Sequence, residues 1–440
     1  MSEKIYSQLN NNGIPLYMRV FEYYKGLISE NKLQSGEKLP SIRRCADDLS
    51  ISRTTAEAAY FQLAADGYVV SKPQSGYFVT DIALRNKNNV IKRSDKVENK
   101  DKIIYDFASL SADRESFDFA LWRRYIKSAL REDERLLSYG EAQGENELRD
   151  ALSEYIKVRR NTVCTKDNIV IGAGVQSLLH ILCPVLTDKK SVYFKDPSFF
   201  QGKAVFYDHG FFITDNIEEA DIIYISPSRI NNRGDVMTTP ERLELISFAE
   251  KENKLIIEDD YDGEFGYFNR PSPSLQGLDG GRNVIYISTF SKLLLPSIRL
   301  SFMILTDDIL SEYRKKSYLY NQTASKTEQL ALCQFIRDGH LSLRVRKIKK
   351  LYAQKTKQLS EVIKKVFNDK AEIHISETGF VLWLKIKSSF SAGEIVKKAR
   401  DAGIAVKQSD GDSQIMLSCS AVPAEDFIKA IKLFYSCIYK

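Results

Sequence analysis

Short apolar runs alternate with helix-length segments through the middle of this 440-residue chain. The runs read NIVIGAG, SVYFKD, ADIIYISPS, KLIIEDD and NVIYISTFSK, and β-branched residues dominate them. Runs this short and this apolar are typical of strands buried on both faces, and the segments between them have the length of crossover helices. The sequence therefore predicts an α/β unit with a mostly parallel central sheet. Sites in such folds lie beyond the carboxyl ends of the strands.

A polar stretch separates this α/β region from the N-terminal part of the chain. Its core reads NKNNVIKRSDKVENKDK, which has almost no apolar residues and cannot bury a core. A chain of this length also exceeds a single hydrophobic core. We therefore predict an N-terminal domain at 1–80, a linker at 81–102 and a large domain at 103–440, which ends in a smaller α+β subdomain.

The N-terminal part carries the pattern of two short helices joined by a tight turn. Ser41 can cap a helix that runs to Leu49, and a second helix is predicted from Arg53 to Asp66. An earlier helix follows from the apolar spacing between residues 15 and 33. Two further apolar runs flank the turn residues PQSG and predict a two-stranded wing. This order predicts a winged helix-turn-helix.

The second helix opens with residues suited to nucleic acid. Ser52, Arg53 and Thr54 place short hydroxyls and a forked donor at a helix N-terminus, where recognition helices meet base edges and phosphates. Net charge adds little, because residues 1–80 hold nine Lys/Arg against eight Asp/Glu. The DNA interpretation therefore depends on the arrangement of residues, and a fold that serves only protein contacts stays open as the alternative.

These motifs resemble the GntR family of winged helices over nearly the full N-terminal domain. The matching elements are LPSxR, the SRTT helix start and the LxxDGY…SGxFV wing. Glu57 stands where related readers often carry an arginine. The resemblance implies that the domain binds double-stranded DNA through Arg43, Ser52, Arg53, Thr54 and Gly76.

Lys292 carries the strongest chemical signal in the large domain. It follows the last apolar run within the sequence STFSK and has apolar neighbours, so desolvation disfavours its ammonium form. Such a lysine is available to form a Schiff base. The hydroxyls of Thr289 and Ser291 precede it, and Arg299 follows seven residues later. These are the groups that a phosphate monoester requires, so the pattern predicts a phosphate-bearing aldehyde cofactor.

Other strand ends carry complementary groups. The run KLIIEDD ends in carboxylates, and a pyridine-ring cofactor needs one carboxylate, here Asp259, to keep its ring nitrogen protonated. The phenol of Tyr261 can bond to a ring hydroxyl. Gly174 precedes a helix whose backbone amides can bind an anion, and Phe199 can lie against a ring face.

Together these motifs resemble fold-type-I aminotransferases over most of 103–440, with Tyr139, Gly144 and Arg149 near the start of the match. With the winged helix in front, the chain resembles the MocR subfamily of GntR regulators. The resemblance implies pyridoxal 5'-phosphate as cofactor, held as a Schiff base on Lys292. It further implies that Asp259 pairs with the pyridine nitrogen, that Tyr261 and Asn231 contact the ring hydroxyl, that Phe199 stacks, and that the phosphate is bound by Gly174, Val175, Gln176, Thr289, Ser291 and Arg299.

Two departures from the family pattern bear on the ligand. Aminotransferases usually carry an arginine near the C-terminal end that forks onto a substrate carboxylate, and the corresponding stretch, residues 414–420, has none. Arg229 stands where related regulators often carry a histidine, and it is a candidate to compensate. We predict that the chain binds the cofactor but does not process an ordinary amino acid in the usual way.

Composition argues against several other classes of protein, namely metal-binding, membrane-spanning and secreted proteins. The six cysteines form no CxxC pair and the four histidines are dispersed, which argues against a metal site and fits the cytoplasm. No apolar run is long enough for a membrane span. The N-terminal residues lack an apolar signal core, so secretion is not expected.

The functional hypothesis is a homodimeric regulator that reads repeated half-sites in an operator. It would sense the vitamer itself, or an amine or amino-acid-type effector that displaces Lys292, without net catalysis. Two alternatives stay open at this point. One is a working aminotransferase with an appended DNA-binding module, and the other is a DNA-binding protein whose large domain only dimerises it.

Overall fold

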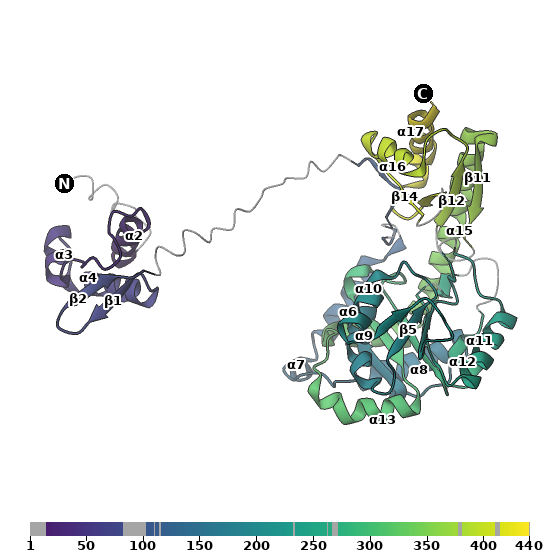
Figure 1. Cartoon of the computed structure of the whole chain (residues 1–440), viewed down its shortest axis with the longest axis horizontal. Helices are drawn as coiled ribbons and strands as arrows, with labels where there is room; N and C mark the ends of the chain where they lie inside the picture. Colours follow the sequence, from purple (N-terminus) through teal and green to yellow (C-terminus); the bar gives the residue numbers. More distant parts are fainter. Residues whose placement is uncertain are drawn as a thin grey trace. The chain divides into compact units, whose positions relative to one another are not determined.

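The computed structural model divides into two compact units, residues 1–99 and 100–440, which are described separately below (Figure 1). The predicted linker at 81–102 falls, except for Asp81, outside the described residues, so its boundaries stay a prediction. The structure describes residues 15–81, 103–109, 111–113, 116–231, 234–261, 263–265, 272–376, 381–409 and 414–439.

The first unit contains the predicted winged helix-turn-helix. Ser41 accepts a hydrogen bond from the backbone N–H of Arg44 at 3.2 Å, and Ser52 accepts one from Thr55 at 3.1 Å, so both helices begin where their capping residues indicate. Ser50 adopts a left-handed conformation, with φ of 51°, and makes the turn between them. The elements are α2 (Leu16–Ser29), α3 (Ile42–Leu49), α4 (Arg53–Ala65), and the antiparallel strands β1 (Val69–Lys72) and β2 (Gly76–Val79).

An aromatic core joins these elements. Tyr60 of α4 is fully buried, packs edge to face against Tyr24 and Tyr77, and donates its hydroxyl to the carbonyl oxygen of Pro40 at 3.0 Å. Helix α4 is thereby fixed against α2, the wing and the segment that precedes α3. This packing sets the orientation of α4, the helix predicted to read DNA.

The second unit is built on a seven-stranded sheet in the order β4-β10-β9-β8-β7-β5-β6. β10 runs in the direction opposite to the other strands of this sheet, which are parallel to one another, so the predicted mostly parallel sheet is confirmed. The strands are β4 (Ile169–Gly172), β5 (Ser191–Phe194), β6 (Phe212–Thr214), β7 (Ile222–Ile225), β8 (Leu255–Asp259), β9 (Val284–Thr289) and β10 (Ser301–Ile304).

Helices cover both faces of this sheet (Figure 1). Tyr224 and Ile257 belong to a core that includes α9 and α10, whereas Ile223 and Ile256 pack with α11 and α12 on the other face. The central strands are therefore buried on both sides, as their uniform apolar sequence predicts. The helices are α6 (Phe119–Ala129), α7 (Asp133–Leu136), α8 (Asn146–Arg160), α9 (Val175–Leu182), α10 (Phe200–Asp208), α11 (Thr239–Lys251), α12 (Leu275–Asp279), α13 (Asp307–Lys316) and α14 (Lys326–Arg337).

The C-terminal part forms the smaller α+β subdomain. Its antiparallel sheet has the order β11-β12-β15-β14, and β13 pairs in parallel with β3 from the start of the unit. No helix among the described residues is long and apolar enough to cross a membrane. The elements are β3 (Tyr105–Asp106), α15 (His340–Phe367), β11 (Ala371–Ile375), β12 (Val381–Ile386), α16 (Ala392–Asp401), β13 (Ile404–Ala405), β14 (Lys407–Gln408), β15 (Gln414–Ser418) and α17 (Phe427–Tyr439).

Candidate cofactor and DNA sites

The order of the strands brings the predicted cofactor residues to one edge of the large sheet. β8 ends with Asp259 and the neighbouring β9 ends with Thr289, three residues before Lys292. Because β10 is antiparallel, it begins at this same edge, where Ser301 lies opposite both Thr289 and Gly172. Arg299, just before β10, therefore lies beside the glycine turn that follows β4.

The glycine turn and Arg299 form a cradle that a side chain would fill. Gly174 has φ of 101°, and a Cβ at this position would lie 2.3 Å from Nη2 of Arg299. The same guanidinium donates to the carbonyl oxygen of Ala173 at 3.4 Å. At the end of β9, which pairs with β10, the hydroxyls of Thr289 and Ser291 lie 3.1 Å apart. Backbone amides at the start of α9, a guanidinium and two hydroxyls are a donor set that fits a phosphate group.

Val175 and Gln176 are the first two residues of α9. Val175 is half-buried against the core that lies under the helix, and Gln176 is exposed. The helix start is further held by Thr323, whose hydroxyl accepts the backbone N–H of Ala173 at 3.0 Å and the Ser177 hydroxyl at 2.9 Å. The helix N-terminus is thus fixed at the cradle, while a contact between Gln176 and a phosphate stays a prediction.

Lys292 lies against the ring of Tyr261. Its ammonium nitrogen is 4.4 Å from the ring centroid, within the range of a cation–π contact. Both residues are half-buried. The two side chains that the sequence assigns to the aldehyde and to the ring hydroxyl of the cofactor are therefore neighbours.

Asp259 is oriented by a tyrosine that the sequence did not single out. The hydroxyl of Tyr224 donates to Oδ2 of Asp259 at 2.7 Å, and burial together with this carboxylate raises the pKa of Tyr224 well above its usual value. Phe199 stacks on Tyr224 with ring centroids 5.4 Å apart. Gly202 leaves room for this ring, because a Cβ there would lie 2.1 Å from Phe199. In the register of β7 and β8, Tyr224 shares a sheet face with Asp259, but a single sequence does not fix that register.

Asp260 has a structural role. Its carboxylate forms an ion pair with Arg160 at 2.6 Å, and it accepts hydrogen bonds from Tyr286 at 2.6 Å and Ser228 at 2.9 Å. The side chains of Arg160 and Asp260 are 2% and 1% exposed, so both charges are out of contact with water. This network fixes the end of β8 and thereby the position of Asp259. Asp260 is therefore the structural carboxylate of the two, whereas Asp259 is the one predicted to contact the cofactor.

The buried carboxyl group of Glu258 should make the stability of the large unit depend on pH. Burial and the nearby charge of Asp260 raise its pKa to about 7, although the backbone N–H of Gln276 donates to it at 3.0 Å. Since the folded pKa exceeds the unfolded value of about 4.3, its contribution to stability is complete at low pH and is lost as pH rises through 7. We expect Glu258→Gln to gain stability relative to wild type between pH 5 and pH 8, on the order of 2 kcal/mol. Chemical denaturation at both pH values measures this.

The control for this prediction is Glu361→Gln, a substitution of the same kind at an exposed position on α15. An equal pH-dependent gain in both variants would contradict the assignment to Glu258.

The side-chain amide of Asn231 is engaged within its own loop. It donates to Oδ2 of Asp235 at 2.8 Å, and Asp235 in turn contacts His374 of β11 at 3.4 Å. The contact of Asn231 with a cofactor hydroxyl therefore stays a prediction. Asn232 and Arg233 of the same motif lie outside the described residues.

The predicted DNA-binding residues lie at the surface of the first unit. Arg43 near the start of α3, and Ser52, Arg53 and Thr54 at the start of α4, are all exposed. The Ser52 hydroxyl is shared with Thr54 at 2.8 Å and also caps the helix, so it organises this terminus, while its contact with DNA stays a prediction. Gly76 opens the second wing strand with φ of 106°.

Two lysines that the sequence did not single out flank the wing. The ammonium nitrogens of Lys72 and Lys38 lie 4.6 and 5.9 Å from the ring centroid of Phe78, and Lys38 pairs with Phe78 through an isolated β-bridge. A Cβ on Gly76 would lie 3.2 Å from Cε of Lys38. One aromatic ring thus holds two exposed cations at the wing, an arrangement suited to DNA phosphates. The β-bridge joins two residues that are far apart in the sequence, so no sequence motif predicts it.

We expect Lys38→Gln and Lys72→Gln each to weaken DNA binding without changing the preferred sequence. Each neutralised phosphate contributes about 0.9 to the slope of log K against log salt, so each variant should lower that slope by roughly this amount. Binding isotherms at several salt concentrations measure it. Lys25→Gln is the matched control, because Lys25 also lies over an aromatic ring, Phe21, but is paired with Glu22 at 2.9 Å. Equal slopes in all three variants would exclude the lysine contacts.

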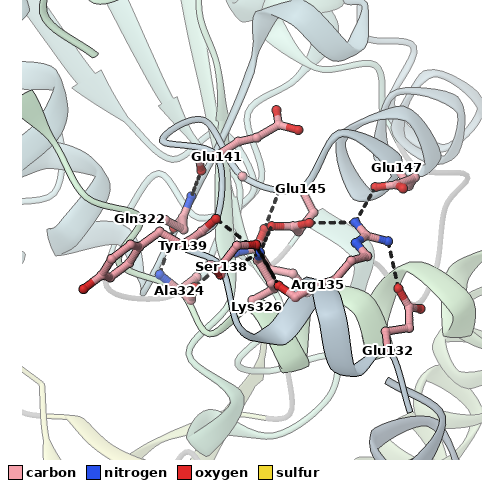
Figure 2. A network of polar contacts seen from close by, with 12 residues as sticks. Glu132, Arg135, Ser138, Tyr139, Glu141, Glu145, Glu147, Gln322, Ala324 and Lys326 are labelled. Atoms are coloured by element: carbon pink, nitrogen blue, oxygen red, sulfur yellow. Dashed lines mark hydrogen bonds and ion pairs between the residues drawn. The ribbon is translucent and has the colours of Figure 1, made fainter. Parts of the chain in front are cut away.

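A polar network orders the segment before α8 (Figure 2). Lys326 donates to the carbonyl oxygens of Arg135, Ser138 and Tyr139 at 2.8 to 3.2 Å. Arg135 bonds in turn to Glu145 at 2.7 Å, as Figure 2 shows. The held segment exposes two large side chains, Leu137 at 90% and Tyr139 at 97%.

The comparisons with known proteins agree with this two-part architecture. Residues 16–79 match the model of bacterial regulatory proteins of the gntR family, and residues 213–426 match that of class I and II aminotransferases. The HTH-type transcriptional regulator YdeL of Bacillus subtilis is 36% identical over 89% of both chains. The probable rhizopine catabolism regulatory protein MocR of Rhizobium meliloti is 26% identical over 89% of this chain and 86% of its own.

Solved structures extend the likeness of the second unit. An archaeal alanine:glyoxylate aminotransferase has a TM-score of 0.67 at 21% identity, over 76% of this chain and 90% of its own. The α-aminoadipate aminotransferase LysN of Thermus thermophilus, complexed with N-(5'-phosphopyridoxyl)-L-leucine, has a TM-score of 0.65 at 19% identity over 76% and 92%. At these identities the likeness establishes the fold alone. The chain belongs to the MocR subfamily of GntR transcription regulators, in which a helix-turn-helix is fused to an aminotransferase-like unit.

Proposed function

We propose that this regulator holds pyridoxal 5'-phosphate on Lys292 and changes its binding to DNA in response to the vitamer or to an effector with an amine group. The observation that carries the proposal is the convergence of three features at one edge of the sheet. Lys292 lies on Tyr261, Asp259 is oriented by Tyr224, and the Gly174 turn faces Arg299. An aldehyde cofactor with a pyridine ring and a phosphate needs this combination of groups.

Each group has a defined task toward the cofactor. The amides of α9, Arg299 and the hydroxyls of Thr289 and Ser291 would bind the phosphate, and Phe199 would cover the ring beside Tyr224. Asp259 would accept a hydrogen bond from the protonated pyridine nitrogen. Tyr224 donates a hydrogen bond to Oδ2 of Asp259 and so fixes the orientation of this carboxylate. When bound, the cofactor supplies an aldehyde carbon that amines can occupy reversibly.

A second copy of the chain completes the proposed assembly. Leu137 and Tyr139 are almost fully exposed although the Lys326 network holds their backbone in place, which is the pattern of side chains presented to a partner surface. A homodimer would carry two winged helices and would therefore read repeated half-sites in an operator. Control of DNA binding further requires that the ligand bind the two states of the protein unequally.

The test is a visible absorption spectrum of the purified full chain with added pyridoxal 5'-phosphate, followed by borohydride reduction and peptide mapping. We expect a saturable absorption band and a reduced adduct on Lys292, and Lys292→Ala should lack both. The control for labelling of surface lysines is Lys347→Ala, which removes an exposed lysine of α15 and should change neither the band nor the adduct. An adduct scattered over surface lysines would contradict the proposal and leave a cofactor-free scaffold.

A further inference from the structure

One buried side chain holds the residues that follow Lys292. Arg344 of α15 donates through Nε to the carbonyl oxygen of Leu293, and through Nη2 to that of Leu294 at 3.1 Å. Leu293 and Leu294 come directly after Lys292 and are 5% and 0% exposed. Because both residues are buried, their carbonyl groups need a donor from the protein, and among the described residues Arg344 is that donor.

The same guanidinium holds a second segment of the chain. Its Nη1 donates to the carbonyl oxygen of Ser116, and its carbon atom lies 4.6 Å from the ring centroid of Phe117. Both residues belong to 105–118, which we call the entry segment because it is the first part of the large unit that the chain reaches after the predicted linker. Within the entry segment, the residues outside the described ones are 110, 114 and 115. Arg344 therefore bridges the entry segment and the residues that follow Lys292.

This bridge consists of a buried charge without a carboxylate partner. Arg344 is 7% exposed, and no carboxylate among the described residues forms an ion pair with it. Burial lowers the pKa of Arg344 to about 10. The free energy lost by burying the charge is offset mainly by the three carbonyl groups that accept its hydrogen bonds. A displacement of the residues after Lys292 would leave a buried group without its partner unless the entry segment moved as well.

The entry segment has further attachments to the large unit. β3, at its start, pairs with β13 of the smaller subdomain. Further along, Asp113 forms a buried ion pair with Lys355 of α15 at 2.7 Å. Helix α15 thus holds the entry segment at two points, and Arg344 is the one of the two that also contacts the residues after Lys292.

We propose that Arg344 transmits to the entry segment whether Lys292 carries the cofactor, and that this is the route by which the site acts on the winged helix-turn-helix. The inference rests on the proposed function, because it assigns the regulation of the same site. Attachment of the cofactor changes where Lys292 is held, and the hydrogen bonds of Arg344 pass the change to the part of the chain next to the linker. Arg344 is a positioning residue, since it contacts main-chain groups that adjoin Lys292. Energetic coupling between two sites must be shown by measuring it.

The first experiment measures how much pyridoxal 5'-phosphate changes the dissociation constant of the full chain for DNA enriched from a random-sequence library. Salt is constant, and the cofactor is present at a concentration that saturates the absorption band of each variant. We expect the change to fall from at least about fivefold in wild type to below about twofold in Arg344→Met, which keeps the length of the side chain and removes its donors. Arg344→Lys keeps the charge but not the forked geometry, and it should recover part of the change.

A second buried arginine provides the matched control. Arg242 of α11 is 1% exposed and also donates to three main-chain carbonyl oxygens at 3.0 to 3.4 Å, those of Met237, Pro227 and Pro273. Arg242→Met therefore removes the same kind of buried donor without touching the entry segment or the residues after Lys292. It should lower the stability of the large unit as Arg344→Met does, but keep the wild-type change in DNA affinity. An equal loss of that change in both variants would contradict the role of Arg344.

Hydrogen exchange gives a second measurement that needs no variant. In wild type, saturating cofactor should slow the exchange of backbone amides in the entry segment by at least about threefold, and Arg344→Met should lack this effect. Mass spectrometry of peptides from residues 105–118 measures it, with peptides from α17 as the internal reference. Unchanged exchange of the entry segment in wild type would overturn the inference, even if Arg344→Met failed to fold or to bind the cofactor.

The outcomes separate this inference from the function on which it rests. If both Arg344 variants keep the full cofactor-dependent change in DNA affinity, the inference is wrong and the proposed function stands. A wild-type chain with no saturable absorption band, or with the same DNA affinity with and without cofactor, would overturn the proposed function itself, and the inference with it.

Discussion

Arg160→Ala should destabilise the large unit by about 3 to 5 kcal/mol, the effect typical of leaving one partner of a buried ion pair without the other. Asp260 would lose its 2.6 Å contact with Arg160 while remaining bonded to Tyr286 and Ser228 in a site that excludes water. Both tryptophans, Trp122 and Trp383, lie in the large unit, so their fluorescence follows the denaturation of this unit in the full chain.

A surface pair provides the control for this substitution. Lys315 contacts Glu312 at 2.6 Å, but their side chains are 64% and 41% exposed, so Lys315→Ala should change the free energy of unfolding by less than about 1 kcal/mol. The double variant Arg160→Met, Asp260→Asn removes both charges and should recover part of the loss. An equal effect of Arg160→Ala and Lys315→Ala would refute the buried network.

Gly174→Ala should weaken binding of pyridoxal 5'-phosphate by roughly 100-fold. The new Cβ would lie 2.3 Å from Nη2 of Arg299 and would force the guanidinium out of the cradle. Loss of one or two charge-assisted hydrogen bonds, each contributing about 1.5 to 3 kcal/mol, accounts for an effect of this size. Titration of the absorption band measures it, and cofactor-free DNA binding should persist because the substitution lies in the second unit.

The controls for Gly174 are glycines that also have a positive φ but open surroundings. Gly210 and Gly280 have φ of 82° and 74°, and a Cβ on either would meet nothing within 4 Å. Alanine at these positions introduces a Cβ at a positive φ without displacing Arg299, although the strain is larger at Gly174, whose ψ is 165° against 18° at Gly280. If they weakened cofactor binding as much as Gly174→Ala does, the effect would belong to strain rather than to the cradle.

The sequence predicted those features that depend on residues close together in the chain, such as helix caps and the ends of buried strands. Ser41 and Ser52 cap their helices as expected, because an N-cap hydroxyl bonds to an amide only three residues away. Asp259 and Lys292 lie at neighbouring strand ends, because buried parallel strands with crossover helices place their carboxyl ends at one edge. The fold class and the family followed from these motifs.

The contacts that could not be predicted from the sequence are those between residues far apart along the chain. Tyr224 reaches Asp259 only through the register of β7 on β8, and Asp260 becomes structural only because Arg160 at the end of α8 is buried against it. The antiparallel direction of β10 brings Arg299 to Gly174, and no apolar run encodes a direction. The pairing of Lys38 with Phe78 likewise depends on how the wing folds back.

The central claim is that the Lys292 site controls the reading of DNA by the winged helix. The most direct measurement is the dissociation constant of the full chain for DNA enriched from a random-sequence library, with and without pyridoxal 5'-phosphate at constant salt, in wild type and in Lys292→Ala. The account predicts a change of at least about fivefold in wild type and none in the variant. The same dissociation constant with and without cofactor in wild type, or an equal change in Lys292→Ala, would contradict it.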